Sequence, residues 1–296
     1  MTGSLAIDLP ALAAALLATV ACGSLGNWLV LRKEAMTGDA IAHAVLPGLV
    51  AGFLVSGTRS AIAMFIGAAL AGAAAVLLTT FVRRSTRLES GAALGVVFTA
   101  FFALGVLLLE TQGARQVDLD PECVLFGSLE TLFYVPPSDG GWISGVPHEL
   151  WTLAAAATLA LGLNIAFGKE LAAYAFDPVH ARLSGRAPIL VERALLAVVT
   201  SAIVASFTAV GSVLVLALLA CPALIAAPHA RSVRGQIGLS LAVGGVLAIG
   251  GYFLAAHAEQ LLGARSALNA AGMIAALMAL AVPCSHAVHA LVSRRA

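Results

Sequence analysis

The chain has 296 residues, of which 60% are hydrophobic and only 10% are charged, and its formal net charge is +1. Soluble domains carry about 25% charged residues, so this composition excludes a water-exposed surface over a chain of this length. The mean hydropathy of +0.99 agrees with this. The net charge gives no sign of the basic surface that nucleic-acid binding requires. We therefore predict an all-α integral membrane protein.

Nine apolar segments come close to the length of about 20 residues that a helix needs to cross a bilayer. The second is short, and only a few residues join the sixth and seventh, which allows one of them to be a broken or re-entrant helix. We predict a polytopic helical bundle of about eight or nine transmembrane helices, forming one domain over residues 1–296. In chain order the segments are Leu9–Leu31, Ala40–Val55, Ala61–Val82, Gly91–Leu109, Leu150–Phe167, Ile189–Phe207, Val210–Ala227, Ile237–Ala256 and Ala267–Val292.

Charge asymmetry between the segments predicts their orientation. The interval Glu110–Glu149 carries several carboxylates against the single Arg115. The intervals that a nine-segment model places on the other side are rich in arginine. The positive-inside rule puts those intervals, and the C-terminus, in the cytoplasm and Glu110–Glu149 outside. The basic residues are Arg32, Lys33, Arg83, Arg84, Arg87, Arg182, Arg186, Arg231, Arg234, Arg294 and Arg295.

Asp39 and His43 place an acid and an imidazole at the start of the second apolar segment, where ionisable groups are costly. Four residues apart, they share one helical face about one turn apart. A carboxylate oxygen and an imidazole nitrogen make half a site for a divalent cation. Pro47 leaves the His43 carbonyl without its helical partner, so that carbonyl can also face the ion. The alternative is a buried hydrogen-bonded pair that locks two helices.

Three further residues are weaker candidates for metal ligands. His257 and Glu259 follow the eighth segment but point to nearly opposite sides of a helix, so we expect both at the membrane surface. Cys221 is a potential soft ligand beside Pro222, although packing in the core is the preferred interpretation. No cysteine pair has the spacing of a metal or redox motif.

Glycine pairs predict where helices approach closely. Gly48-x-x-x-Gly52 and Gly91-x-x-x-Gly95 have the small-xxx-small spacing that brings membrane helices together. Such pairs are common in helical bundles, so they predict packing and carry no information about a substrate.

The interval between the fifth and sixth segments contains a helix start. Asp177 is suited to capping free backbone N–H groups, and Pro178 is suited to the first helical position. Gly185 would end this helix about two turns later. We predict a short amphipathic helix on the basic side, which either links two crossings or contacts a cytoplasmic partner.

Three passages carry a family resemblance. They are Gly38–Gly48 (GDAIAHAVLPG), Phe176–Gly185 (FDPVHARLSG) and Val210–Ala226 (VGSVLVLALLACPALIA), and Leu125–Leu129 (LFGSL) is a weaker match. In order and spacing the chain resembles the permease subunits of the bacterial ATP-binding-cassette (ABC) importers for manganese, zinc and iron. The likeness covers most of the chain, and the first passage is specific.

The resemblance implies a site and a set of structural residues. Asp39 and His43 would accept the transported metal ion. The short helix would contact the ATPase through residues Asp177, Pro178, Ala181 and Gly185. The residues with structural roles would be Pro47, Gly48, Gly211 and Pro222.

The resemblance also implies partners and a location. The chain would be a transporter subunit in the bacterial cytoplasmic membrane, not an enzyme, and would form a homodimer. A separate cytoplasmic ATPase subunit would bind and hydrolyse ATP, and an extracytoplasmic protein would deliver manganese, zinc or iron. No cofactor would be bound permanently, because the metal ion is cargo.

Because the sequence departs from the family pattern at several positions, the identity of the transported metal stays open. Ala42 stands where the family has serine, Cys221 precedes the proline, and His257–Arg265 replaces a small-residue pattern. One acid and one imidazole suit all three metals.

Two other functions stay open on the residues alone. The first is a proton-coupled secondary transporter that uses Asp39 and His43 as a relay. The second is an intramembrane metal hydrolase, for which a third ligand and a general base are missing.

Overall fold

The structure is a computed structural model and describes residues 2–57, 61–86, 90–110, 127, 129, 132, 134, 145–183, 188–257 and 268–293. Within this part of the chain, eight helices are long and apolar enough to cross a membrane. The prediction of an all-α bundle with about eight or nine transmembrane helices is confirmed. The helices are α1 (Thr2–Leu31), α2 (Ala35–Ser56), α3 (Ala61–Thr86), α4 (Ser90–Leu109), α7 (His148–Phe176), α9 (Pro188–Ala226), α10 (Val233–Ala256) and α12 (Ala270–Ser293).

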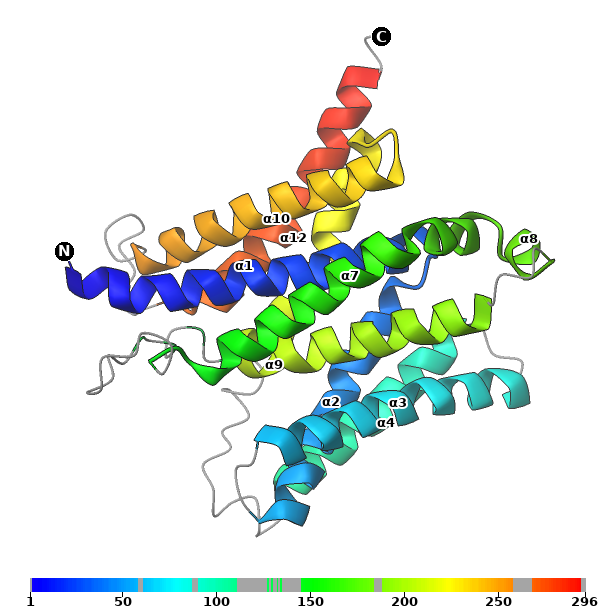
Figure 1. Cartoon of the computed structure of the whole chain (residues 1–296), viewed down its shortest axis with the longest axis horizontal. Coiled ribbons are helices and arrows are strands. Elements are labelled where there is room, and N and C mark those ends of the chain that lie inside the picture. The colour runs from blue at the N-terminus through cyan, green and yellow to red at the C-terminus, as the bar shows by residue number, and fades with distance from the viewer. Residues whose placement is uncertain are drawn as a thin grey trace.

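The predicted sixth and seventh segments form one element, the 39-residue α9. An unbroken helix of that length would measure roughly 60 Å, about twice the thickness of the hydrocarbon core. Instead, α9 is kinked at Gly211 (φ 78°, ψ 165°), a conformation open essentially to glycine alone. Figure 1 shows the light-green half running to one end of the bundle and the yellow half returning. The predicted broken helix is therefore α9.

A second glycine of positive φ supports the kink of α9. Gly127 (φ 74°) comes from the connection between α4 and α7, and a Cβ atom on it would overlap the backbone of Val210 and Gly211. Leu129 and Leu132 follow it and are buried in the main hydrophobic core. Gly127 therefore packs against the point where α9 reverses, and the two leucines are anchored in the core of the bundle.

The helices form a larger and a smaller group (Figure 1). In the larger group, α1 packs against α7, α9 and α10, and α12 packs against α9 and α10. Its core includes the fully buried Trp28 and Leu195. The smaller group contains α2, α3 and α4, with small cores of its own around Ala44 and Leu46. Contacts of α2 with α9 join the two groups, so α2 occupies the boundary between them.

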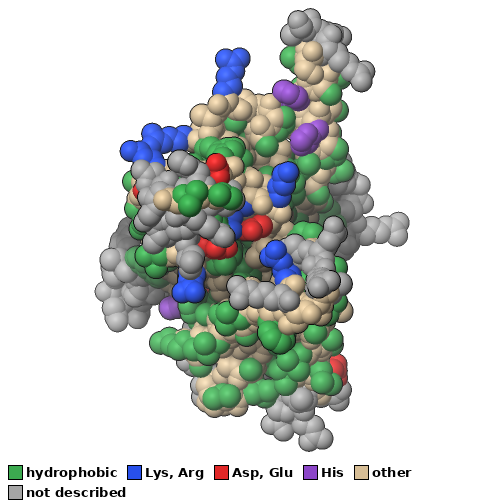
Figure 2. Space-filling model, turned by 90° about the vertical axis from the view of Figure 1, so that its right-hand side faces the viewer, with side chains coloured by type: hydrophobic (Ala, Val, Ile, Leu, Met, Phe, Trp, Pro, Cys, Tyr) green, Lys and Arg blue, Asp and Glu red, His purple; other side chains and the backbone are tan. Residues whose placement is uncertain are grey.

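Basic residues gather at one end of the bundle. Arg32 and Lys33 lie between α1 and α2, Arg83 lies near the end of α3, and Arg231 and Arg234 flank the start of α10 after the 3-10 turn η2 (Ala227–His229). Figure 2 shows Lys and Arg side chains over this face. The short helix α8 (Pro178–Leu183) lies at the same end in Figure 1. The predicted clustering is therefore seen for these five residues, while Arg87, Arg186, Arg294 and Arg295 lie outside the described residues.

The acidic interval Glu110–Glu149 falls largely outside the described residues. The helices that it connects, α4 and α7, respectively end and begin at the end of the bundle opposite α8 (Figure 1). The interval thus starts and finishes away from the basic residues.

Two predicted glycine pairs have different surroundings. A Cβ atom on Gly48 would overlap the Gly67 carbonyl on α3, and one on Gly52 would overlap the backbone of Ala63. This pair brings α2 and α3 together as predicted. By contrast, a Cβ atom on Gly91 or Gly95 of α4 would have no heavy atom of another described element within 4 Å. The prediction of close packing at that second pair is wrong within the part of the chain that the structure describes, because that face of α4 has no neighbouring helix.

Candidate functional site

A tight turn fixes where α2 begins. The N–H groups of Lys33 and Glu34 return to carbonyls near the end of α1, at 3.0 and 2.7 Å. This pattern closes a helix with one residue in the left-handed region, here Lys33 at φ 59°. The sequence pattern placed the start of this segment at Ala40, but α2 already begins at Ala35. Asp39 therefore lies inside the helix, in its second turn.

Asp39 and His43 contact each other on one face of α2. The Asp39 Oδ1 and His43 Nε2 atoms are 3.2 Å apart, and the side chains are 39% and 20% exposed. The imidazole packs on two rings of α4, with centroid distances of 4.6 Å to Phe98 and 5.5 Å to Phe102. These rings orient the imidazole while the carboxylate stays accessible. The arrangement offers one oxygen and one nitrogen ligand to a cation.

Pro47 and Gly48 hold this face of α2 between its two neighbours. Pro47 has no N–H group, so the His43 carbonyl one turn earlier lacks its helical donor. Pro47 is buried, and a Cβ atom on Gly105 of α4 would come 3.0 Å from its ring. Gly48 faces α3 on the other side. The two residues thus set the position of the Asp39–His43 face between α3 and α4.

The weaker ligand candidates do not join this pair. Among the described residues there is no group of three or more His, Cys, Asp and Glu side chains that could hold a metal ion. His257 is exposed at the end of α10, with its Nδ1 3.0 Å from the Phe253 carbonyl oxygen. Cys221 packs against the main core from α9. Glu259 lies outside the described residues.

The predicted short helix is present as α8. Asp177 separates it from α7, and its six residues begin at Pro178. The Ala181 N–H donates to the Asp177 carbonyl at 3.0 Å, and the Ala181 side chain is buried against the bundle. Gly185, the expected end of the helix, lies outside the described residues.

An apolar surface lies beside this helix start. Phe176, Val179 and Leu183 are 68%, 66% and 82% exposed. Val179 and Leu183 are four residues apart and share a face of α8. The three side chains lie together at the basic end, with Phe176 as the last residue of α7 and the other two on α8. We call these three residues the α8 surface.

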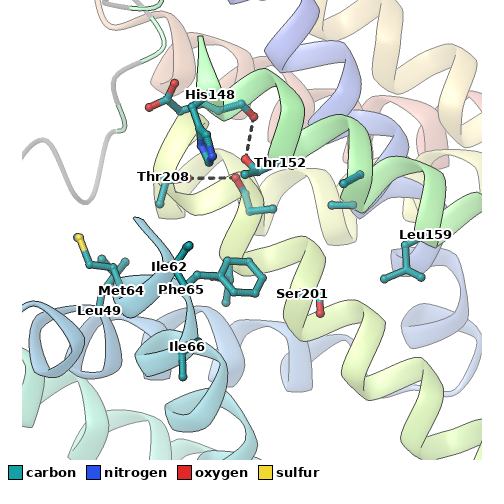
Figure 3. Close-up of a pocket in the computed structure, with 15 residues that line it drawn as sticks. Leu49, Ile62, Met64, Phe65, Ile66, His148, Thr152, Leu159, Ser201 and Thr208 are labelled. Atoms are coloured by element: carbon teal, nitrogen blue, oxygen red, sulfur yellow. Dashed lines mark hydrogen bonds between the residues drawn. The ribbon is translucent and has the colours of Figure 1, made fainter. Parts of the chain in front are cut away.

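A cavity of about 630 Å³ lies between α2, α3, α7 and α9. Figure 3 shows His148, Thr152 and Thr208 at one end of it and Phe65 and Ile66 on a wall from α3. The Thr152 and Thr208 hydroxyls donate to carbonyls of their own helices, at 2.9 and 3.2 Å. Its lining is mostly apolar apart from His148 and Glu149 at the start of α7, and these two belong to no group of three or more potential metal ligands among the described residues.

Sequence reasoning missed one group of polar side chains. In the sequence, Arg32 indicated only the orientation of the chain in the membrane. In the structure, its guanidinium lies 3.2 Å from the Glu192 carboxylate on α9, and its side chain is 7% exposed. Tyr174 of α7 joins the same group. The only local signal was an arginine at the end of an apolar segment, and it does not reveal a partner 160 positions away.

The family and the individual proteins that this chain resembles agree with one another. A model of the ABC 3 transport family matches residues 5–282. The chain is 40% identical over 252 residues to the manganese transport system membrane protein MntD of Bacillus subtilis, covering 82% of each chain. It is 33% identical over 270 residues to the zinc transport system membrane protein TroD of Treponema pallidum, covering 91% of this chain and 72% of that relative.

A solved structure agrees in fold. It is described as PsaBC from Streptococcus pneumoniae in complex with Fab, and it superposes with a TM-score of 0.75 at 25% identity, covering 94% of this chain and 90% of that one. The relatives are named as membrane proteins of transport systems, in agreement with the predicted transporter subunit. With eight helices able to cross a membrane in its described part, the chain is a multi-pass membrane permease and belongs to the ABC 3 transport family.

Proposed function

We propose that this chain is the membrane-spanning subunit of an ATP-driven importer that carries manganese or zinc ions into a bacterial cell. The observation that carries the proposal is the contact of Asp39 with His43 inside a membrane helix, at 3.2 Å. The relatives named for manganese and zinc transport support the cargo. Iron fits the same ligand types, but the relatives described above support manganese and zinc. Residues 1–296 act as one transmembrane permease domain.

Two copies of the chain complete the ion pathway in this proposal. One chain offers a carboxylate and an imidazole, and the Asp39 side chain is 39% exposed. A twofold dimer with this face at its centre would present two oxygen and two nitrogen ligands, a set that manganese and zinc both accept. Binding is brief, because a pathway site has to release its ion. The ion is cargo, and the chain holds no permanent cofactor.

The other partners follow from the two ends of the bundle. The basic end faces the cytoplasm by the positive-inside rule, in the cytoplasmic membrane of a bacterium. There a separate ATPase subunit, which alone binds ATP, contacts the α8 surface and the segment from Asp177 to Gly185. At the opposite end, where α4 and α7 are connected, an extracytoplasmic binding protein delivers the metal ion.

Metal uptake by cells that depend on this chain tests the site. We expect Asp39→Asn and His43→Gln each to lower manganese or zinc uptake by at least about tenfold. Mutation of a residue that only hydrogen-bonds to a metal ligand already lowers metal affinity or activity by about that factor. Both variants should insert into the membrane at the normal level, because the two side chains are partly exposed. His257→Gln and Cys221→Ser are the matched controls and should transport normally.

Two results would overturn parts of the proposal. Normal uptake by both site variants would place the pathway elsewhere. Uptake that persists without the ATPase subunit and follows a pH gradient would instead favour the alternative, a proton-coupled secondary transporter that uses Asp39 and His43 as a relay.

A further inference from the structure

Arg32 forms a buried polar network at the basic end of the bundle. Its Nη2 lies 3.0 Å from Glu34 Oε2 and 3.2 Å from Glu192 Oε1. The guanidinium stacks over the Tyr174 ring, with Cζ 4.6 Å from the ring centroid, and the Tyr174 hydroxyl donates to Glu192 Oε2 at 2.8 Å. The Arg32 side chain is only 7% exposed. Charge-assisted bonds and stacking of this kind hold an arginine more firmly than an exposed ion pair does.

The network joins the elements on both sides of α8. Tyr174 lies in the last turn of α7, directly before α8, and Glu192 lies in the second turn of α9, after it. The two side chains thus lie on the helices that precede and follow α8 in the chain, through which a movement of α8 can reach them. Both contact the same guanidinium.

The other side of the network leads to the metal-site helix. Arg32 follows the last residue of α1, and Glu34 precedes the first residue of α2. Asp39 lies five residues beyond Glu34, about 7.5 Å along the helix. Gly38, next to Asp39, lies in close contact with side chains of α1 and α9 through Leu29 and Leu219. The start of α2 is thus held by the same turn that places Arg32.

The hydrogen bonds of Arg32 are not all used. Its Nη1 atom is buried without an acceptor, and Glu170 Oε2 on α7 is buried without a donor, within the described part of the chain. Glu170 and Tyr174 are four residues apart, so they share the face of α7 on which Arg32 stacks. An unpaired buried donor and an unpaired buried acceptor on adjoining elements allow Arg32 to exchange Glu192 for Glu170 when α7 and α9 shift.

We propose that Arg32 is a positioning residue that transmits movement of α8 to α2, and so to Asp39 and His43, by changing its acidic partner between Glu192 and Glu170. The inference rests on the proposed function for the identity of the partner that moves α8. A residue with two alternative acidic partners on α7 and α9, placed on the connection from α1 to α2, is a physical basis for such coupling.

The test uses the full transporter with its ATPase subunit. We expect Arg32→Ala and Glu192→Gln each to lower metal uptake per ATP hydrolysed by about tenfold, the usual size of a coupling effect, while the subunits still co-purify. Arg193→Ala is the matched control, because Arg193 is exposed on the neighbouring position of α9. Glu170→Gln should also lower uptake per ATP hydrolysed without lowering thermal stability, because it removes only the second acidic partner of Arg32, whereas a purely structural Arg32–Glu192 pair predicts no effect of this change.

A distance measurement tests the role of Arg32 independently of which metal ion is transported. Spin labels at Met36 on α2 and Lys169 on α7, both exposed, report the relative movement of the two helices when ATP is added, with or without metal. We expect the distance to change in the otherwise unmodified protein and in Arg193→Ala, and to stay constant in Arg32→Ala. A change that persists in Arg32→Ala, or no change in the unmodified protein, overturns the role of Arg32. If the distance responds but neither manganese nor zinc is carried, the cargo assignment fails and the coupling role stands.

Discussion

At the residue scale, single atoms decide how closely α2 approaches its neighbours. Gly48 and Gly91 both begin a small-xxx-small pair, and nothing in their local sequence distinguishes them. In the structure, the first lies on the backbone of α3 and the second faces open space. The same difference bears on the site, because Gly48 follows Pro47 one turn beyond His43.

We predict opposite effects of alanine at these two glycines. Gly48→Ala places a methyl group on the Gly67 carbonyl, and overpacking of this kind destabilises by about 1–3 kcal/mol. Gly91→Ala meets no neighbour and gains up to about 1 kcal/mol of helix propensity. Thermal unfolding of the purified protein in detergent measures both. Equal melting temperatures for the two variants would contradict the packing of α2 on α3.

At the element scale, two short features shape the bundle where the sequence pattern shows only apolar residues. Gly211 turns α9 back on itself, and α8, which follows the membrane-capable helix α7, exposes Val179 and Leu183. Within α8, Ala181 faces the bundle, while Val179 and Leu183 face away from it. The helix thus has one side that docks on the permease and one side that is available to a partner.

We predict that the two sides of α8 respond differently to a charge. Val179→Asp and Leu183→Asp should each prevent co-purification with the ATPase subunit and change the free energy of unfolding by no more than about 0.5 kcal/mol, as exposed positions do. Ala181→Asp should lower stability, because it buries a charge. Co-purification and thermal unfolding, measured on the same samples, check both effects. Normal assembly of the Val179 and Leu183 variants would exclude this surface as the contact.

At the scale of the whole molecule, the two ends of the bundle differ in charge. Lys and Arg side chains gather at one end (Figure 2), and the opposite end is where α4 ends, α7 begins and α10 ends (Figure 1). The orientation of α10 therefore determines which end the ATPase and the binding protein can reach.

We predict the sidedness of α10 by cysteine labelling. In a background without Cys22, Cys123, Cys221 and Cys284, His257→Cys should react with a membrane-impermeant thiol reagent in intact cells. Arg231→Cys, at the other end of the same helix, should react only after lysis. Both positions are exposed, so differences in reaction report the side of the membrane and not burial. The reverse pattern would invert the bundle and place α8 outside the cell.

The sequence by itself determined the features that depend on composition and on local spacing. The apolar segments, the basic intervals and the shared face of Asp39 and His43 follow from helix geometry and from the thickness of a bilayer, which need no knowledge of neighbouring helices. Only the tertiary structure decided the reversal of α9 at Gly211, the open face of α4 at Gly91, and the contact of Arg32 with Glu192. Each of these depends on which segments distant in the chain pack together, and apolar periodicity is the same whether a helix faces lipid or another helix.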